Sequence, residues 1–397
     1  MNPDLERLQS YPFQKLSALI DGVNPPPGQR PIPLHIGEPR HPTPEFIRQA
    51  VAANLDGLAN YPATLGGEGL RTAIAEWLVR RYGLEAVDPA REIIPVNGSR
   101  EALFAFAQAV IDASRPGPVV VCPNPFYQIY EGAALLAHAT PHYLNTLPEK
   151  DYALDFEELP DEVWRRTQLV YVCTPGNPTG RTMPLAEWER LFALSDRYGF
   201  VIASDECYSE IYFDEERPPL GALQAARQLG RSSYPRLVMF SSLSKRSNVP
   251  GMRSGFVAGD AGILRKFLLY RTYHGCAMSP PLHAASIAAW KDEAHVVENR
   301  RLYREKFAAA LEILGPVLDV TMPDAAFYLW PRTPVPDPEF VRGLYRGQGV
   351  SVLPGSYLAR AARGVNPGQD RVRIALVASL DECVEAARRI RAFVESL

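Results

Sequence analysis

Short apolar runs alternate with amphipathic stretches through the first two thirds of the chain. The runs are bounded by glycine, proline or polar residues, which is typical of buried strands. The stretches between them repeat apolar residues every three or four positions, as amphipathic helices do. Because buried strands separated by helices are typical of parallel sheets, we expect an α/β fold with a mainly parallel sheet covered by helices on both faces. The predicted strands are 93–96, 118–122, 169–173, 200–204, 237–241 and 256–258, and the helices between them include 98–113, 126–138 and 184–198.

The two ends of the chain differ from this alternating middle. Residues 1–44 are rich in proline, which predicts an extended arm with room for one short helix. Beyond about residue 290, helices and strands no longer alternate regularly, which favours an α+β lobe. We therefore expect a large domain over residues 45–290 and a smaller domain that combines residues 291–397 with the arm. The other predicted elements are helices at 44–55, 67–82, 281–314, 338–348 and 380–397, apolar segments at 317–321 and 327–330, and strands at 350–353 and 372–377.

Composition and charge narrow the class of protein. The formal net charge is -3, so no basic excess indicates binding to nucleic acid or to an anionic membrane surface. The apolar runs are far shorter than a membrane span, and the first residues lack the basic and apolar regions of a secretory signal. The cysteines are scattered without metal-binding spacing, which predicts reduced thiols and no metal site. We therefore expect a cytoplasmic protein without a nucleic-acid or membrane partner.

A single lysine follows the predicted strand 237–241. Lys245 would lie just past the C-terminal end of that strand, where open α/β sheets bind ligands. A lysine amine there can form a Schiff base with a carbonyl cofactor. The hydroxyl of Ser242 and the guanidinium of Arg253 could hold a phosphate nearby. Taken alone this motif is weak, because most lysines are solvated surface residues.

Three other predicted strands also end in polar groups. Strand 93–96 leads into residues 98–100 at the start of a helix, and this start is either an anion site or a plain helix cap. Strand 169–173 is followed by Asn177 in the turn Thr-Pro-Gly-Asn-Pro-Thr-Gly. Asn177 is either a positioned hydrogen-bond donor or part of an ordinary turn. Strand 200–204 runs into Asp205, with Tyr208 close by, and this carboxylate is either solvated or paired with a buried cation. Because the carboxyl ends of parallel strands meet at one edge of a sheet, these groups and Lys245 would converge.

Pyridoxal 5′-phosphate needs this combination of groups. Its aldehyde takes a lysine amine, its ring nitrogen needs a carboxylate, and its ring oxygen needs phenol and amide donors. Its phosphate fits a helix N-terminus with serine and arginine side chains. We therefore expect pyridoxal 5′-phosphate as the cofactor.

Three motifs carry a resemblance to a known family. They are Ser-Leu-Ser-Lys-Arg-Ser-Asn-Val-Pro-Gly-Met-Arg, Cys-Thr-Pro-Gly-Asn-Pro-Thr-Gly and Ser-Asp-Glu-Cys-Tyr. The chain resembles the fold-type I, class I and II aminotransferases of the aspartate aminotransferase superfamily over nearly its whole length. It departs from the family pattern at Ser254, which replaces a small or apolar aliphatic residue, and at Ala325-Ala326, where a glycine usually precedes the aromatic residue. The resemblance implies the three-layer α/β/α large domain of pyridoxal-phosphate-dependent transferases with a smaller α+β domain.

The resemblance also implies roles in cofactor binding and catalysis. Lys245 would carry the cofactor and move the proton, and Asp205 would pair with the ring nitrogen. Tyr208 and Asn177 would donate to the ring oxygen, and Tyr127 would stack on the ring. The residues that would hold the phosphate are Gly98, Ser99, Arg100, Ser242 and Arg253.

Further residues would bind the substrate or the partner subunit. Arg373 would clamp the substrate α-carboxylate, near Asn177 and Gly37. We favour Arg373 over Arg371 because the neighbours of Arg373 should face one side of their strand and Arg373 the other. Tyr61 would reach the phosphate of the partner subunit, which implies a homodimer with shared active sites. Plain packing or turn roles remain open for Gly37 and Tyr61.

The implied reaction is transfer of an amino group between an amino acid and a 2-oxo acid. Residues 8–16 and 36–44 are similar to the arm of proteobacterial succinyldiaminopimelate transaminases. That likeness implies N-succinyl-LL-2,6-diaminopimelate and 2-oxoglutarate as substrates, in lysine and diaminopimelate biosynthesis. A cation should meet the distal carboxylate, and Arg40 and Arg246 are candidates by their position near the motifs.

Three alternatives to this function remain. One is another class I or II aminotransferase, acting on aspartate, alanine, aromatic or acetylornithine-type substrates. Another is a β-lyase on the same fold, because β-elimination uses the same lysine and cofactor. The last is an effector-binding regulator, for which the short proline-rich head leaves no room for an appended DNA-binding helix-turn-helix.

Overall fold

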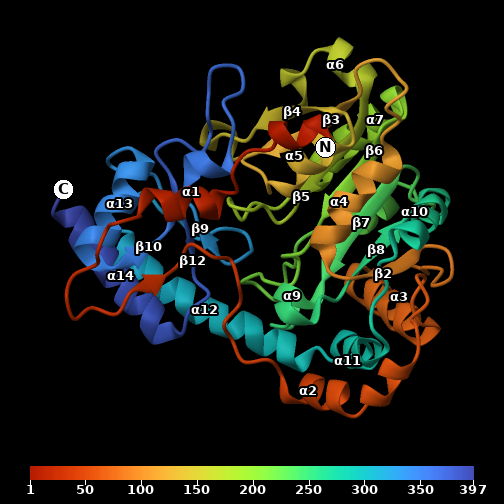
Figure 1. Cartoon of the computed structure of the whole chain (residues 1–397), viewed down its shortest axis with the longest axis horizontal. Helices are drawn as coiled ribbons and strands as arrows, with labels where there is room; N and C mark the ends of the chain where they lie inside the picture. Colours follow the sequence, from red (N-terminus) through yellow and green to blue (C-terminus); the bar gives the residue numbers. More distant parts are fainter.

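A seven-stranded sheet forms the centre of the large lobe in the computed structural model, which describes residues 1–397 (Figure 1). The strand order across the sheet is β2-β8-β7-β6-β5-β3-β4. Neighbours from β7 to β4 run parallel, whereas β8 runs antiparallel to both β7 and β2. The prediction of a mainly parallel sheet is therefore confirmed. The strands are β2 (Ile93–Val96), β3 (Val119–Asn124), β4 (Thr140–Asn145), β5 (Thr167–Cys173), β6 (Val201–Asp205), β7 (Leu237–Ser242) and β8 (Gly255–Gly259).

The edge strand β4 has no counterpart among the predicted strands. Its sequence, Thr-Pro-His-Tyr-Leu-Asn, is mostly polar, and its first four residues are exposed or half-buried. It pairs only with β3, so one side of it carries no neighbouring strand. An edge strand needs no continuous apolar run, which is why the hydrophobic pattern does not indicate it.

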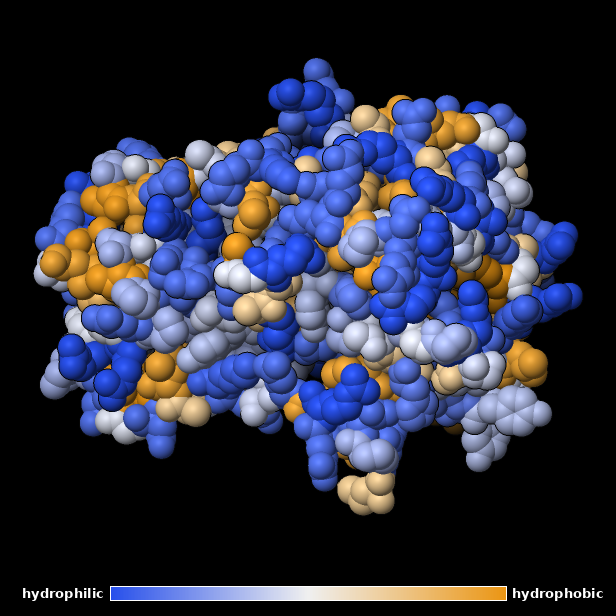
Figure 2. Space-filling view, turned by 90° about the horizontal axis from the view of Figure 1, so that it is seen from above, coloured by the Kyte–Doolittle hydropathy of each residue, from blue (hydrophilic) through white to orange (hydrophobic).

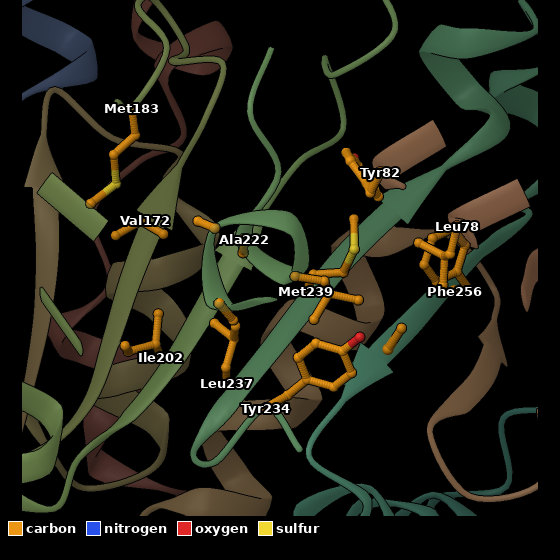
Figure 3. Close-up of a cluster of buried hydrophobic side chains, with 14 of the residues drawn as sticks. Leu78, Tyr82, Val172, Met183, Ile202, Ala222, Tyr234, Leu237, Met239 and Phe256 are labelled. Carbon is orange, nitrogen blue, oxygen red and sulfur yellow. The ribbon is translucent and has the colours of Figure 1, made fainter. Parts of the chain in front are cut away.

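Successive residues of the central strands point into two different cores, as the two-residue period of a strand requires. In β7, Leu237 and Met239 point into one core, and Val238 and Phe240 point into the other. Figure 3 shows the first core, where Leu237 and Met239 gather with Ile202 of β6. The sheet is thus covered on both faces, which confirms the three-layer α/β/α prediction. The helices that pack into the first core include α2 (Glu45–Ala52), α3 (Glu68–Tyr82), α6 (Asp161–Arg166), α7 (Leu185–Tyr198), α8 (Ala222–Gln228) and α11 (Pro280–Lys291), and those in the second are α4 (Ser99–Val110), α5 (Ile129–Leu136) and α10 (Ala261–His274).

A smaller lobe lies beside the large one and has its own hydrophobic core (Figure 1). It contains an antiparallel sheet in the order β11-β12-β9 and a parallel pair of β1 with β10. Leu16 and Leu34 of the N-terminal arm are buried in this core, so the arm packs on the smaller lobe. The elements are α1 (Pro12–Leu19), β1 (Ile32–Pro33), α12 (Ala294–Leu314), β9 (Tyr328–Leu329), α13 (Asp337–Gln348), β10 (Val350–Ser351), β11 (Leu353–Pro354), β12 (Val372–Ala375) and α14 (Leu380–Glu395).

The stretch 281–314, predicted as one long helix, forms two helices with a break between them. Helix α11 ends at Lys291 and α12 begins at Ala294. The carboxylate of Asp292 accepts a hydrogen bond from the backbone N–H of His295, so it satisfies a free donor in the first turn of α12. Helix α11 packs on α2 and α3, whereas α12 packs on α14. We propose the domain boundary at this break, close to residue 290. Residues 317–321 form neither a helix nor a strand.

Hydrophilic residues cover most of the face seen in Figure 2, with hydrophobic areas scattered between them. Among the helices, none combines the length and the apolar character that crossing a membrane requires.

Candidate active site

A cavity of about 530 Å³ opens at the edge of the large sheet where the parallel strands end. Its walls come from strand ends of the large lobe, from β12 of the smaller lobe and from the N-terminal arm. The convergence expected from the strand ends is present, because most predicted site residues lie in this one wall. Those that line the cavity are Gly37, Ser99, Arg100, Tyr127, Asn177, Asp205, Tyr208, Ser242, Lys245, Arg253 and Arg373.

Lys245 lies in the short helix α9 (Leu243–Arg246), which begins directly after β7. Its Nζ atom donates to the carbonyl oxygen of Gly37 at 2.6 Å and lies over the ring of Phe327. Burial lowers the pKa of Lys245 to about 8, and Arg373 and Arg100 add to this effect. A lysine with this pKa is partly neutral near physiological pH, so its amine is available as a nucleophile and as a base.

Asp205 is the last residue of β6 and is buried, at 5% exposure. The phenol of Tyr130 donates to its Oδ2 at 2.6 Å, and the backbone N–H of Cys207 donates to its Oδ1 at 3.3 Å. Burial raises the pKa of Asp205, while these hydrogen bonds act in the opposite direction. Asp205 is therefore a buried carboxylate held by neutral donors, and it can stabilise a cationic ring nitrogen brought into the cavity.

Tyr130 is a site residue that the sequence analysis did not assign. Its ring stacks on Tyr171, with centroids 4.6 Å apart, and this contact holds the phenol against Asp205. The only sequence signal is its place in Pro-Phe-Tyr-Gln-Ile-Tyr, three residues after Tyr127. Residues three apart share a helix face, so Tyr130 could have been paired with Tyr127 from that spacing.

Tyr208 and Tyr328 form a second pair of phenols, with their oxygens 2.8 Å apart. Burial raises the pKa of both, so both stay protonated and can donate. Gly37 lies against this pair, and a Cβ atom at Gly37 would be 2.0 Å from Tyr328 Oη. Gly37 therefore has a packing reason to be glycine, and Tyr328 is a second site residue that the sequence analysis did not assign.

Arg373 is a buried cation, at 4% exposure, that forms no ion pair within the chain. Its guanidinium donates to Asn177 Oδ1 and to the His35 carbonyl oxygen, both at 2.9 Å, and lies 4.5 Å from the centroid of the Tyr328 ring. Its Nε atom is buried without a partner. A buried guanidinium with spare donors beside a cavity fits an incoming carboxylate.

The alternation argument does not distinguish Arg373 from Arg371, because residues two apart on a strand face the same side. The two differ in their surroundings instead. Arg371 donates to the Trp330 carbonyl oxygen and lies over the ring of Tyr152, and it does not line the cavity. Only Arg373 reaches the cavity. The geometry therefore favours Arg373 because of its contacts, and not because of strand alternation.

Gly98, Ser99 and Arg253 lie together at the start of α4. Gly98 has a φ angle of 85°, which favours glycine, and a Cβ atom there would be 2.2 Å from Arg253 Nη2. The sulfur of Cys207, which was not assigned a role, lies 2.9 Å from Ser99 Oγ and 3.8 Å from Ser242 Oγ. A helix N-terminus, two hydroxyls and a guanidinium form a site suited to a phosphate.

Arg100 also lines the cavity, but its guanidinium contacts two tyrosines. Its Nε donates to the phenol oxygen of Tyr127 at 2.5 Å, and its Nη2 lies 3.4 Å from Tyr11 Oη of the arm. Its role in phosphate binding stays a prediction, as does the stacking role of Tyr127.

Gly98 does not itself line the cavity, and three more distant residues singled out in the sequence do not reach it either. Tyr61 is fully exposed, at 103%, and lies outside the cavity wall. Arg40 is exposed and does not line the cavity either. Arg246 is buried and binds the Ala289 carbonyl and the Glu293 carboxylate, so it is not free to meet a distal carboxylate of the substrate.

Comparison with known proteins agrees with this geometry. Residues 29–390 match the family described as aminotransferase class I and II. A solved aminotransferase from Neisseria meningitidis Z2491 is 54% identical, with a TM-score of 0.96 and coverage of 99% of each chain. The LL-diaminopimelate aminotransferase of Syntrophobacter fumaroxidans is 31% identical over 394 residues, which cover 98% of this chain and 97% of that enzyme. A Thermus thermophilus structure described as a probable N-succinyldiaminopimelate aminotransferase is 28% identical, with a TM-score of 0.83 and coverage of 96% of this chain and 100% of that one.

The family match spans most of the chain, and the relatives align with it from end to end. The cavity wall contains the lysine, carboxylate, phenols and arginine that the sequence motifs predict. The chain therefore belongs to the class I and II aminotransferases, and it is an enzyme that transfers amino groups.

Proposed function

We propose that this aminotransferase carries pyridoxal 5′-phosphate on Lys245 and transfers the amino group of N-succinyl-LL-2,6-diaminopimelate to 2-oxoglutarate. Members of the family use this cofactor. The observation that supports it most strongly here is Asp205, a buried carboxylate that receives only neutral donors and faces the cavity. Burying such a charge is costly unless a cation joins it, and a protonated pyridine nitrogen is such a cation.

The other cavity residues fit the cofactor as well. The amine of Lys245 is held only by the Gly37 carbonyl, so it is free to bond to an aldehyde. The lack of a side chain at Gly98 lets the Arg253 guanidinium lie against the first turn of α4, so the guanidinium and the free N–H groups of the helix could bind one phosphate together. The amide nitrogen of Asn177 remains available, because Arg373 occupies its Oδ1 atom.

The bound cofactor would act as an electron sink for the carbon that loses its proton. The Nζ atom of Lys245, whose pKa burial lowers to about 8, would accept that proton as a general base and hold it next to the substrate. Arg373 holds the α-carboxylate of either substrate, which orients the α-carbon toward Lys245. Tyr208 and Asn177 line the same cavity and would donate hydrogen bonds to the ring oxygen.

Two observations support a diaminopimelate-type substrate. Residues 8–16 and 36–44 are similar to the arm of succinyldiaminopimelate transaminases, and Tyr11, Phe13 and Gly37 from these stretches line the cavity. The named relatives include LL-diaminopimelate aminotransferases at 30–31% identity and the Thermus enzyme described above. The free LL-diaminopimelate substrate is the second candidate, because the relatives with that name align over nearly the whole chain.

A panel of amino donors with 2-oxoglutarate tests the proposal. The donors are N-succinyl-LL-2,6-diaminopimelate, LL-diaminopimelate, N-acetylornithine and aspartate, and glutamate formation is measured. We expect the highest kcat/KM with the succinylated donor. Preference for LL-diaminopimelate would favour the second candidate. A separate assay with L-cystathionine, whose sulfur is a leaving group on Cβ, tests the β-lyase, which would release homocysteine, ammonia and pyruvate from it. A colourless protein that takes up no pyridoxal 5′-phosphate would refute the cofactor assignment.

We also propose a homodimer in which Tyr61 reaches the phosphate site of the partner subunit. Several large apolar side chains are exposed near Tyr61 and on α10, which is unusual unless another surface covers them. They are Leu55, Leu58, Leu269 and Tyr273, and their exposure ranges from 51% to 88%. Sedimentation of the purified protein tests the dimer, and a monomer that retains full activity would contradict shared active sites.

A further inference from the structure

A line of buried polar groups runs from α12 to the main chain of Lys245. Lys306, at 2% exposure, lies with its Nζ atom 2.5 Å from His41 Nε2. The other ring nitrogen of His41 lies 2.7 Å from Asn299 Oδ1. The amide nitrogen of Asn299 donates to the carbonyl oxygens of Lys245 at 3.3 Å and of Arg246 at 3.5 Å.

The hydrogen bonds in this line have one consistent direction. An ammonium group only donates, so His41 accepts at Nε2 and must carry its proton on Nδ1. The Nδ1–H then donates to Asn299 Oδ1, and the two backbone carbonyls require the NH₂ of Asn299 to face them. Burial lowers the pKa of Lys306 to about 8 and that of His41 to about 4, so the charged lysine and neutral histidine are compatible with this arrangement near neutral pH.

Helix α9 needs this support because it is only four residues long. The last carbonyl groups of a helix have no partner within the helix, and a helix this short has almost no internal hydrogen bonds. Asn248, which follows shortly after the helix, has a φ angle of 54° and donates to the same Asn299 Oδ1 at 3.1 Å. The Asn299 amide therefore holds both the end of α9 and the turn that follows it.

The arm contacts Lys245 directly through Gly37 and indirectly through His41. Gly37 accepts the Lys245 amine, and His41, four residues later, supports the Lys245 main chain through Asn299. Thr43 also donates to the Asn248 carbonyl oxygen at 3.0 Å. The segment 37–43 thus connects the reactive lysine of the large lobe to α12 of the smaller one.

We propose that His41 and Lys306 are positioning residues for Lys245: the Lys306 amine sets the tautomer of His41, and His41 orients the Asn299 amide that holds the Lys245 carbonyl. This inference rests on the proposed function, in which Lys245 is the residue that bonds to the cofactor. Without the donor at Lys306, His41 can place its proton on Nε2, and its Nδ1 lone pair then repels Asn299 Oδ1. A misplacement of the main chain at Lys245 moves its amine relative to the cavity.

The cost of burying the Lys306 charge distinguishes a positioning role from a role in stabilising the fold. The Lys306 ammonium is buried without a carboxylate partner, since His41 is its only hydrogen-bond partner and no ion pair involves it. Its other favourable contact is with the ring of Tyr303, 5.1 Å from Nζ to the centroid, against which a methionine side chain can also pack. Replacing a buried charge that has no carboxylate partner by an apolar side chain of similar volume is often neutral or stabilising. A positioning role therefore predicts that Lys306→Met keeps or raises Tm while it impairs Lys245.

The test compares Lys306→Met, His41→Phe and His41→Gln with the unchanged chain. The rate at which cofactor-free protein bonds to pyridoxal 5′-phosphate is followed by absorbance, with borohydride reduction and mass spectrometry to locate the bond at Lys245. We expect Lys306→Met and His41→Phe to lower this rate and kcat by about tenfold, with KM for 2-oxoglutarate unchanged because Arg373 is untouched. His41→Gln keeps an acceptor and a donor and should recover most of the loss.

Tyr303→Phe is the matched control. Tyr303 packs against His41, with ring centroids 4.7 Å apart, but its hydroxyl is buried without a partner, so its loss should leave both rates unchanged. Normal rates in Lys306→Met and His41→Phe would overturn the inference. It would also be overturned if the two rates fell only in proportion to a fall in Tm and His41→Gln did not restore them. If the unchanged chain fails to bond to the cofactor at Lys245, the proposed function fails instead.

Discussion

The phenol oxygen of Tyr130 lies 2.6 Å from Oδ2 of Asp205, the last residue of β6, and both residues are buried. Tyr130 comes from α5, a different element, so two segments far apart in sequence fix one carboxylate. The hydrogen bond favours the charged form of Asp205 and opposes the rise in its pKa that burial causes. Tyr130 therefore helps to keep Asp205 ionised for the cofactor.

Tyr130→Phe should weaken cofactor binding without unfolding the protein. Loss of a hydrogen bond to a carboxylate costs about 1.5 kcal/mol, so we expect about tenfold lower affinity for pyridoxal 5′-phosphate. Titration of cofactor-free protein, followed by visible absorbance, measures this affinity. Tyr171→Phe is the control, because its hydroxyl donates to the Leu103 carbonyl and not to Asp205. Equal affinities for the two variants would show that the phenol of Tyr130 does not act on Asp205.

The rate of cofactor capture should depend on pH through Lys245. Only the neutral amine attacks an aldehyde, so the rate rises as pH passes upward through the pKa of the lysine. Burial lowers that pKa to about 8 from the usual 10.5, so the rise should be centred near pH 8. Stopped-flow mixing of cofactor-free protein with pyridoxal 5′-phosphate over a pH series measures the midpoint.

Lys245→Ala is the companion variant for this experiment. It should show no covalent capture at any pH and no transamination, although the cofactor can still bind without a covalent bond. Retained turnover in this variant would refute the assignment of Lys245. A midpoint near the ordinary lysine value would show that the amine is more solvated than the structure indicates.

Gly37→Ala should impair substrate binding through Tyr328. The new methyl group would lie 2.0 Å from Tyr328 Oη, so the ring must leave its place under Arg373 and beside Tyr208. We expect kcat/KM to fall by about tenfold or more, because overpacking typically costs about 1–3 kcal/mol. Steady-state kinetics on Gly37→Ala, Tyr328→Phe and the double variant measure the coupling. Phenylalanine lacks the oxygen that would clash most closely and keeps only a milder contact of its ring at 2.9 Å. The double variant should therefore lose less activity than the two single losses combined, and simple additivity would contradict the steric explanation.

The residues proposed to carry the cofactor chemistry were the most predictable from sequence. Lys245, Asp205 and Asn177 each follow a buried apolar strand, so the strand pattern alone places them at one sheet edge. The pattern does not indicate β4, because a half-exposed edge strand has no need for apolar residues. It also merges α11 and α12, because the break is caused by one local carboxylate and not by a change in periodicity.

The residues that act through tertiary contacts were not predictable in this way. Tyr130 and Tyr328 meet Asp205 and Tyr208 only after distant segments pack together. Nothing in the neighbouring sequence of Lys306 shows that its side chain is buried against His41, 265 positions away. The role of Arg40 or Arg246 at the distal carboxylate was inferred from nearness in sequence, and their placement in the fold does not support it.

Arg373 and Arg371 provide a direct test of the carboxylate site, because they lie two residues apart and only Arg373 lines the cavity. Arg373→Ala removes a buried guanidinium that faces the cavity, and loss of a charge-assisted hydrogen bond costs about 2 kcal/mol. We expect KM for both the amino donor and 2-oxoglutarate to rise by about 30-fold, since both substrates present an α-carboxylate to the same residue. Arg371→Ala removes a hydrogen bond to the Trp330 carbonyl oxygen and a contact with the Tyr152 ring, both outside the cavity, and should leave both KM values within about twofold. If Arg373→Ala raises KM for only one of the two substrates, or if Arg371→Ala has the larger effect, the α-carboxylate binds elsewhere.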